Sequence, residues 1–303
     1  MISIFDIFKI GIGPSSSHTV GPMKAAAAFA DLLHAENLDT QVARIVIEVY
    51  GSLALTGIGH GTFDALLLGL EGSLPHDIPL ADIPQRLERI RTQHVLKLNG
   101  REMAFNPEKD LDIRGDKVLP KHPNGLNFIA YHSDGLKLKE QIYYSVGGGF
   151  IVTEEGFAQE AQENADVPYP YKNCDELLAQ CRLNQLNISE VVLANEAALA
   201  GCDEAEVRRR VAAVADVMEN CIKRGLGAEG QLPGGLNVRR RAPQLAAKLK
   251  VLRESEIVNT QLWPMVYAMA VNEENAAGGR VVTAPTNGAA GIVPAALHYF
   301  RKF

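Results

Sequence analysis

The sequence lacks several features that would place it in a specialised class of protein. No apolar run reaches the roughly 18 residues needed to span a bilayer, so we expect no membrane partner. The first residues include Asp6 and Lys9 and lack the basic-then-apolar order of a signal peptide. The 4 cysteines form no C-x-x-C pair and are too few in 303 residues for a disulfide scaffold. These absences predict a cytoplasmic protein with reduced thiols.

Positive charge is not in excess either. The chain has 30 Lys and Arg against 36 Asp and Glu, a net charge of −6, and no broad basic stripe. We therefore expect no nucleic acid partner. A hydrophobic content of 47% and a charged content of 22% are typical of a globular protein and argue against disorder. At roughly 150 residues per domain, the length indicates about two domains.

The first half of the chain mixes strand and helix patterns. Asn99-Gly100 between two short apolar runs predicts a type I′ hairpin, and Ser133-Asp134-Gly135 predicts a second hairpin. The predicted strands are 43–50, 95–98, 102–105, 126–132 and 136–144, and the predicted helices are 20–34 and 62–69.

Beyond about residue 157 the strand patterns stop. We predict helices at 175–183, 189–199, 204–223, 244–258 and 263–275. Ser189 and Asp203 are the expected N-caps of two of them. The polar stretch 152–162 is the expected linker. The sequence therefore predicts a two-domain α+β protein, with an α/β sheet domain at 1–155 and a helical domain at 156–303.

Two segments place a histidine just before a predicted helix. The first, 11–22, contains Ser15, Ser16, Ser17, His18 and Thr19. Free N–H groups and the helix dipole favour an anion there, although a serine-rich cap with an exposed histidine fits equally well.

The second histidine segment, 51–62, ends in Gly-His-Gly-Thr and contains His60, Gly61 and Thr62. A helix N-terminus disfavours the charged form of a histidine, which keeps the ring neutral and able to act as a base. The alternative is a structural or exposed histidine.

Three further segments are rich in glycine or arginine. Gly147–Gly149 fits an anion cradle, but a structural bulge is the favoured interpretation. The arginines Arg239–Arg241 fit either a carboxylate site or a solvated turn. The last segment, 278–291, contains Thr286, Asn287 and Gly288 before another helix, and we favour a functional role for it.

Taken in order along the chain, these five segments resemble those of the bacterial iron–sulfur-dependent L-serine dehydratases. The resemblance implies an N-terminal α/β domain similar to a serine-binding regulatory domain of phosphoglycerate dehydrogenases. It also implies a helical catalytic domain that carries a 4Fe–4S cluster. The implied reaction converts L-serine to pyruvate and ammonia.

The same resemblance places the cluster cysteines beyond Phe303. We therefore expect the 303 residues to be the first part of a longer protein, without turnover when isolated. No metal ligand is predicted within the chain, and its own cysteines are expected to be buried thiols on helix faces: Cys174, Cys181, Cys202 and Cys221.

On this resemblance, His60 is the predicted general base, and His18 is a second candidate or an orienting partner. L-Serine is the expected small-molecule partner, and a homodimer is the expected assembly because symmetric dimers are the commonest. The residues expected to hold the substrate are Ser15, Ser16, Ser17, Thr19, Gly61, Thr62, Thr286, Asn287 and Gly288.

Two alternatives stay open at this point. One is a non-catalytic module that binds an amino acid for regulation. The other is a pyridoxal-phosphate-dependent dehydratase, which needs a Schiff-base lysine beside a phosphate cradle. The lysines considered for that role lie in helix or charged hairpin contexts: Lys24, Lys117, Lys137 and Lys223.

Overall fold

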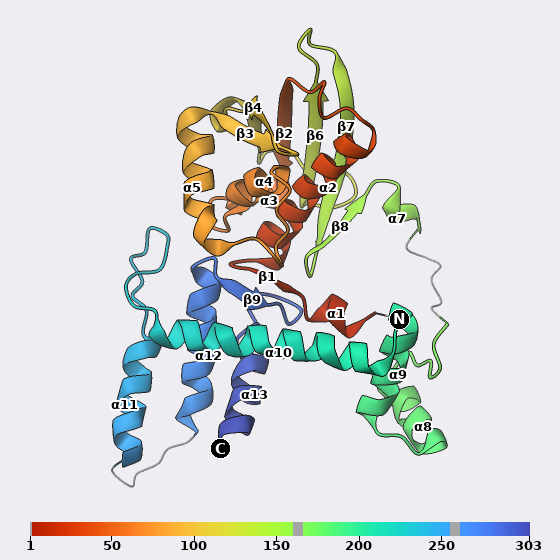
Figure 1. Cartoon of the computed structure of the whole chain (residues 1–303), viewed down its shortest axis with the longest axis vertical. Coiled ribbons are helices and arrows are strands. Elements are labelled where there is room, and N and C mark those ends of the chain that lie inside the picture. The colour runs from red at the N-terminus through yellow and green to blue at the C-terminus, as the bar shows by residue number, and fades with distance from the viewer. Residues whose placement is uncertain (1, 160–165, 255–260) are drawn as a thin grey trace.

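A computed structural model of the chain describes residues 2–159, 166–254 and 261–303. A sheet with its helices forms one half of the molecule, and a set of helices forms the other (Figure 1). The long helix α10 (Glu204–Gly227) runs across the molecule below the sheet half. The chain is therefore of the α+β class, as the sequence indicates.

The main sheet has five strands in the order β5-β2-β6-β7-β8. Strand β2 pairs parallel with β5 and antiparallel with β6. Its residues Ile45, Ile47 and Val49 are fully buried, which matches the alternation expected from the sequence. The strands span β2 (Arg44–Tyr50), β5 (Leu111–Arg114), β6 (Gly125–Tyr131), β7 (Lys137–Gly147) and β8 (Phe150–Thr153).

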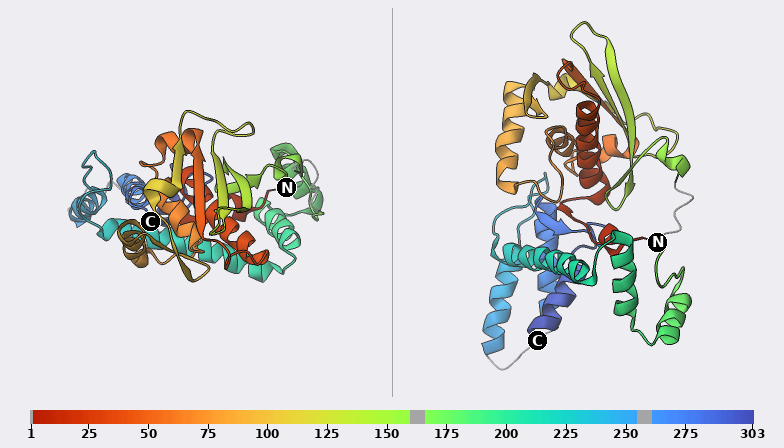
Figure 2. Two further views of the ribbon diagram at one scale, coloured as in Figure 1. Left: turned by 90° about the horizontal axis from the view of Figure 1, so that it is seen from above. Right: turned by 45° about the vertical axis from the view of Figure 1, so that its right-hand side comes forward.

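Helices α2 (Gly21–Ala35) and α4 (Thr62–Leu70) pack closely against each other beside the sheet (Figure 2). Gly69 makes this approach possible, because a Cβ at that position would lie 2.3 Å from the carbonyl oxygen of Met23. Phe29 of α2 stacks on Phe128 of β6 with ring centroids 5.2 Å apart. The sheet half therefore has its own hydrophobic core.

The predicted hairpins are confirmed. Strands β3 (Val95–Leu98) and β4 (Arg101–Ala104) are joined by Asn99 and Gly100, both with positive φ as a type I′ turn requires. The second turn joins β6 and β7. The shorter helical elements of this half are α3 (Gly51–Thr56), η2 (Leu80–Asp82), α5 (Ile83–Glu88), η3 (Arg89–Gln93), α6 (Pro107–Asp110) and α7 (Gly156–Gln159).

The helical half has a second core around Trp263 and Tyr267, whose rings stack 5.4 Å apart. Besides α10, its helices are α8 (Cys174–Asn184), α9 (Ile188–Ala200), α11 (Ala242–Glu254), α12 (Leu262–Ala276) and α13 (Ile292–Lys302). None of the helices in the described parts of the chain is long and apolar enough to cross a membrane.

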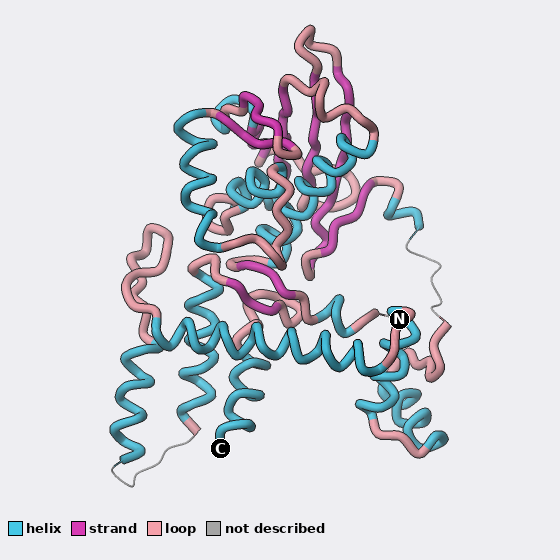
Figure 3. Tube along the Cα trace, viewed as in Figure 1, coloured by secondary structure: helices cyan, strands magenta, loops and turns pink. Residues whose placement is uncertain are grey.

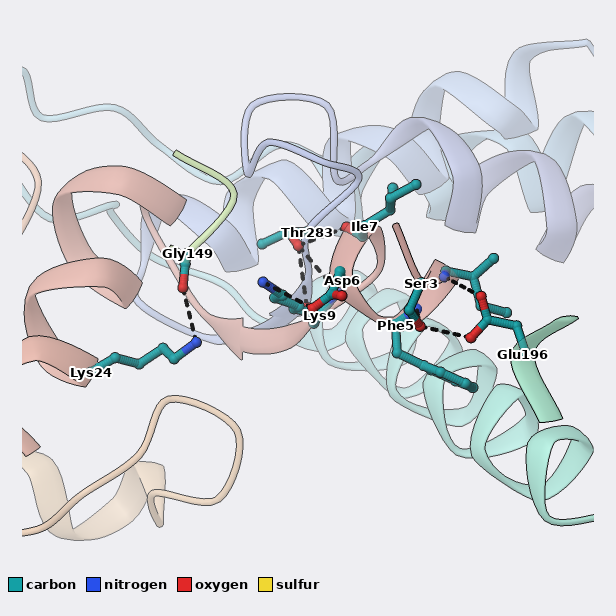
Figure 4. Close-up of polar contacts among 10 residues, drawn as sticks. Ser3, Phe5, Asp6, Ile7, Lys9, Lys24, Gly149, Glu196 and Thr283 are labelled. Carbon is teal, nitrogen blue, oxygen red and sulfur yellow. Dashed lines mark hydrogen bonds and ion pairs between the residues drawn. The ribbon is translucent and has the colours of Figure 1, made fainter. Parts of the chain in front are cut away.

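The two halves are joined by a strand pair that the sequence pattern did not predict. Strand β1 (Ile10–Ile12) pairs antiparallel with β9 (Arg280–Val282), between the sheet and the helices (Figure 3). Helix α1 (Ile4–Ile7) precedes β1, and buried Glu196 of α9 accepts hydrogen bonds from Ser3 Oγ and the backbone N of Ile4 (Figure 4). The expectation of a strand-free second half was therefore wrong. A boundary near 155 stays a prediction.

Two local predictions also need correction. Helix α9 is capped by Asn187, because its side chain and that of Glu190 form a reciprocal capping box, so Ser189 lies inside the helix. Asp203 caps α10 as predicted.

The expected linker at 152–162 begins inside β8 and continues into α7, and its residues 160–162 lie outside the described parts. For the helix predicted at 244–258, residues 255–258 also lie outside them.

Candidate active site

The fold places the two predicted histidines side by side. His18 lies in the π-helical turn η1 (Ser16–Val20), directly before α2, and His60 lies in the turn before α4. Their ring centroids are 4.8 Å apart. Gly61, with φ of 62°, makes the sharp turn that lets helix α4 start immediately after His60. The close packing of α2 on α4 thus brings both segments to one place.

Two threonines tie the histidine turns together. The Thr19 hydroxyl donates to the carbonyl of His60 at 2.7 Å, and the Thr62 hydroxyl donates to the carbonyl of His18 at 2.6 Å. Thr19 is only 3% exposed, and Thr62 is 0% exposed. Both threonines were predicted to hold the substrate, and the contacts seen here position the two histidines.

The hydrogen bonds give the two rings different roles. His60 Nδ1 lies 2.9 Å from the carbonyl oxygen of Thr56. Because a carbonyl only accepts, the neutral ring carries its proton on Nδ1 and its lone pair on Nε2. Nε2 has no hydrogen-bond partner among the described residues. This is the arrangement that a general base requires.

His18 is held at both ring nitrogens. Ser17 Oγ lies 2.9 Å from Nδ1, and Ser52 Oγ lies 3.0 Å from Nε2. Burial lowers the pKa of His18 below its ordinary value, and the nearby His60 lowers it further. His18 is therefore an oriented ring next to the His60 ring, with its charged form disfavoured.

The three serines of the first segment face different surroundings. Ser15 is the N-cap of η1 and accepts from the backbone N of His18, as the cap interpretation expects. Ser16 is buried, whereas the Ser17 side chain contacts His18 and its carbonyl accepts from buried Ser145 Oγ at 2.7 Å. Of the three hydroxyls, only that of Ser17 contacts an imidazole.

A cavity of about 580 Å³ adjoins the histidine turns. Its lining includes Thr19, Gly59 and Gly61 from the first two segments, together with the turns 233–235 and 276–279 from the helical half. Neither imidazole lines it, but the residues on both sides of His60 do. A volume of this order suits a small-molecule ligand.

The last segment reaches the same junction. Asn287 is 2% exposed, and its Nδ2 donates to the carbonyl of Ile12 at 3.2 Å and to Asn275 Oδ1 at 2.9 Å. Its own Oδ1 has no partner among the described residues. Thr286 and Gly288 lie on the exposed side of this loop. Asn287 therefore bridges the helical half to strand β1.

The remaining two segments have structural contacts. Gly147, Gly148 and Gly149 all have positive φ and form the tight turn between β7 and β8, in line with the favoured interpretation. In the arginine run, Arg240 pairs with buried Glu274 at 2.9 Å. Arg239 and Arg241 are exposed. One of the three arginines thus holds a carboxylate of the protein itself.

Comparison with known proteins adds the decisive observation. Residues 3–156 match the family model of the serine dehydratase beta chain, and residues 183–303 match that of the alpha chain. The chain belongs to the serine dehydratase family.

Its relatives are named L-serine dehydratases. The chain is 48% identical to the L-serine dehydratase of Streptomyces coelicolor, 47% to L-serine dehydratase 2 of Escherichia coli and 41% to the enzyme of Helicobacter pylori. These alignments cover 100%, 100% and 99% of this chain, and 66%, 67% and 66% of the relatives. The chain spans about two thirds of the length of the relatives that it matches.

The cysteines of this serine dehydratase chain do not fit an iron–sulfur cluster. Cys174 is exposed, Cys181 and Cys202 are half-buried, and only Cys221 is buried, so the expectation of four buried thiols was wrong. Burial raises the pKa of Cys221 to about 12, which opposes the thiolate form that binds metal. No group of three or more candidate ligands comes together within the described ranges.

Some residues around the histidine pair were not singled out from the sequence. Ser52 contacts His18, and Ser145 supports Ser17. The loop 117–124 is also part of the surroundings, because the backbone N of Ser52 donates to the carbonyl of Pro123. Ser52 lies inside the predicted segment 51–62, and Ser145 lies just before Gly147–Gly149. No local sequence pattern indicated the loop.

Proposed function

We propose that the protein acts as an L-serine dehydratase, forming pyruvate and ammonia from L-serine at the junction of its two halves. The observation that carries the proposal is the histidine pair, with a lone pair on His60 Nε2 and no hydrogen-bond partner for that atom among the described residues. The family membership and the names of the relatives support the substrate.

In this proposal His60 Nε2 takes the α-proton of serine. The electron pair left on Cα forms a double bond to Cβ as the Cβ–O bond breaks, and the leaving hydroxyl takes the proton from His60 to become water. The aminoacrylate that results tautomerises to an imine, and water hydrolyses the imine to pyruvate and ammonia. An imidazole with its lone pair on Nε2 suits the first step, because that nitrogen can accept the proton.

The other residues of the proposed site orient the histidines or bind the substrate. His18 contacts the substrate or orients His60, while Thr19 and Thr62 fix the two turns. Ser15, Ser16 and Ser17, Gly61, and the Thr286–Gly288 loop are the proposed surroundings of the carboxylate and ammonium groups. Ser17, whose hydroxyl contacts His18, is the strongest of these candidates.

The family resemblance implies that a 4Fe–4S cluster supplies the Lewis acid that helps the hydroxyl leave. The described cysteines do not form its ligand set, so we assign no residue of this chain to that step. The structure also bears on the pyridoxal alternative, because Lys24 Nζ donates to the carbonyl of Gly149 at 3.0 Å. That turn presents a carbonyl to the lysine, where a phosphate cradle would present N–H groups.

The test is His60→Ala in an anaerobic preparation that converts L-serine to pyruvate. We expect kcat to fall by at least about 10²-fold, the usual loss for a missing general base. The matched control is His34→Ala, because the side chain of His34 is 73% exposed and lies away from the pair. A near-normal kcat in folded His60→Ala would overturn the assignment. Saturable L-serine binding without turnover would instead support an amino-acid-binding module.

A further inference from the structure

A second cavity lies apart from the histidine pair. Its volume is about 680 Å³, and it lies between the α1–β1 segment, the start of α2 and the middle of α10. Its lining combines apolar side chains such as Phe5 and Phe8 with five basic residues: Lys9, Lys24, His76, Arg209 and Arg210. Basic side chains from three separate parts of the sequence thus line one cavity.

The two lysines of the lining are half-buried, and Figure 4 shows their polar contacts. The Lys9 side chain is 16% exposed, with Nζ 3.0 Å from the centroid of the Phe150 ring and 3.6 Å from Asp6 Oδ1. Lys24 Nζ donates to the carbonyl of Gly149, and no carboxylate lies within 4.0 Å of it among the described residues. Lys24 therefore has no ion-pair partner among the described residues, and Asp6 acts on its charge only at longer range.

The charges of the cavity do not balance. Lys9, Lys24, Arg209 and Arg210 contribute four positive charges. The carboxylates that pair with them are Asp6, next to Lys9, and Glu206, which both arginines share. Four minus two leaves an excess of about two positive charges, without counting His76, which has its own neighbour Asp77.

Without a ligand, the buried positive charge of this cavity destabilises the folded chain. Burial lowers the pKa of Lys9 to about 8, with Lys24 as the next cause, and burial also lowers the pKa of Lys24. A buried lysine whose charge is disfavoured by desolvation and by a second ammonium group is stabilised by an anion placed between the two.

We propose that this cavity binds a small oxyanion of about two negative charges, a phosphate group or a dicarboxylate, between Lys9 and Lys24. The apolar residues of the lining leave room for a short carbon chain attached to the anion. The site is distinct from the candidate active site: Val20 and Lys24 line this cavity, whereas Thr19 and Met23 of the same segment line the other.

Isothermal titration of the 303-residue chain tests the proposal, in a buffer that lacks phosphate and carboxylate. One arm uses inorganic phosphate and the other uses succinate, with chloride at equal ionic strength as the blank. Saturable binding in either arm supports the site, and the stronger arm identifies the anion class. Absence of saturable binding in both arms would overturn it.

Three variants assign the binding to this cavity. Lys24→Met should weaken binding about tenfold, as expected for the loss of one charge-assisted hydrogen bond. The control Lys248→Met, at an exposed lysine of α11, should leave it unchanged. Glu206→Gln should strengthen binding, because it frees Arg209 and Arg210 from their shared carboxylate.

The outcome does not depend on a single variant. Should Lys24→Met fail to fold, Lys9→Met carries the same expectation of weaker binding. Equal affinities for the wild type and the folded lysine variants would show that the anion binds elsewhere and would contradict the proposal.

Discussion

At the scale of single residues, the two histidines differ because of the atoms around each ring. A backbone carbonyl fixes the proton of His60 on Nδ1, while two serine hydroxyls hold both nitrogens of His18. The sequence predicted both residues from their glycine and serine neighbours. The resemblance made His60 the predicted base and His18 a second candidate or orienting partner, but the contacts of Thr56 and Ser52 could not be predicted, because only the folded α3 helix creates them.

Lys9 gives a residue-scale prediction of pH dependence. Its pKa falls from 10.5 to about 8 in the folded chain, chiefly through burial, so between these values the unfolded chain binds more protons. Stability from this group therefore rises as the pH rises from about 8 to 10.5. Below pH 8 Lys9 is charged in both the folded and the unfolded chain, so the full destabilising contribution of its buried charge is present.

The variant Lys9→Met removes that pH-dependent contribution. We expect the Tm difference, variant minus wild type, to be most positive below pH 8 and to shrink as the pH approaches 10.5. Thermal melting followed by circular dichroism at pH 7, 9 and 10.5 measures it. Lys248→Met should show a flat difference, and a flat difference for Lys9→Met as well would contradict the pKa shift.

At the scale of elements, the packing of α2 on α4 positions the site, and Gly69 is where it can be tested. A methyl group at residue 69 would lie 2.3 Å from the Met23 carbonyl oxygen and 2.7 Å from the Cβ of Ala26. We expect Gly69→Ala to lower the free energy of unfolding by about 1–3 kcal/mol through overpacking, although helix propensity alone would raise it.

Urea unfolding measures this change through the midpoint at constant slope. Gly227→Ala in α10 is the matched control, because a Cβ there meets nothing within 4 Å and should be neutral or stabilising. An unchanged or higher midpoint for Gly69→Ala would show that the two helices do not approach as closely as described.

Elements with strong local signals could be predicted from the sequence, and those that depend on distant partners could not. The Asn99-Gly100 hairpin and the helices 20–34 and 204–223 follow from turn chemistry and periodicity. Strand β9 is three residues long and exists because it pairs with β1, from the opposite end of the sequence. Nothing in its own residues distinguishes it from a loop.

At the scale of the whole molecule, segments far apart in the sequence meet at one junction. Asn287 and Asn275 bond to the β1 region from the helical half, Ser145 bonds to Ser17, and the turn 233–235 shares a cavity with Thr19. The candidate segments could be predicted from the sequence. Their proximity in space could not be predicted from it. This proximity arises because strand β1 pairs with β9 of the helical half, and Ser3 and Ile4 before it bond to Glu196.

The histidine pair is the proposed place where serine meets its base. Nitrogen-15 NMR of the histidine side chains in the 303-residue chain, titrated with L-serine, tests this most directly. We expect His60 in the Nδ1–H tautomer, and shifts of the His60 and His18 signals with L-serine but not with D-serine, while His34 stays unmoved. An Nε2–H tautomer at His60, or L-serine that leaves both rings unmoved, would contradict the account.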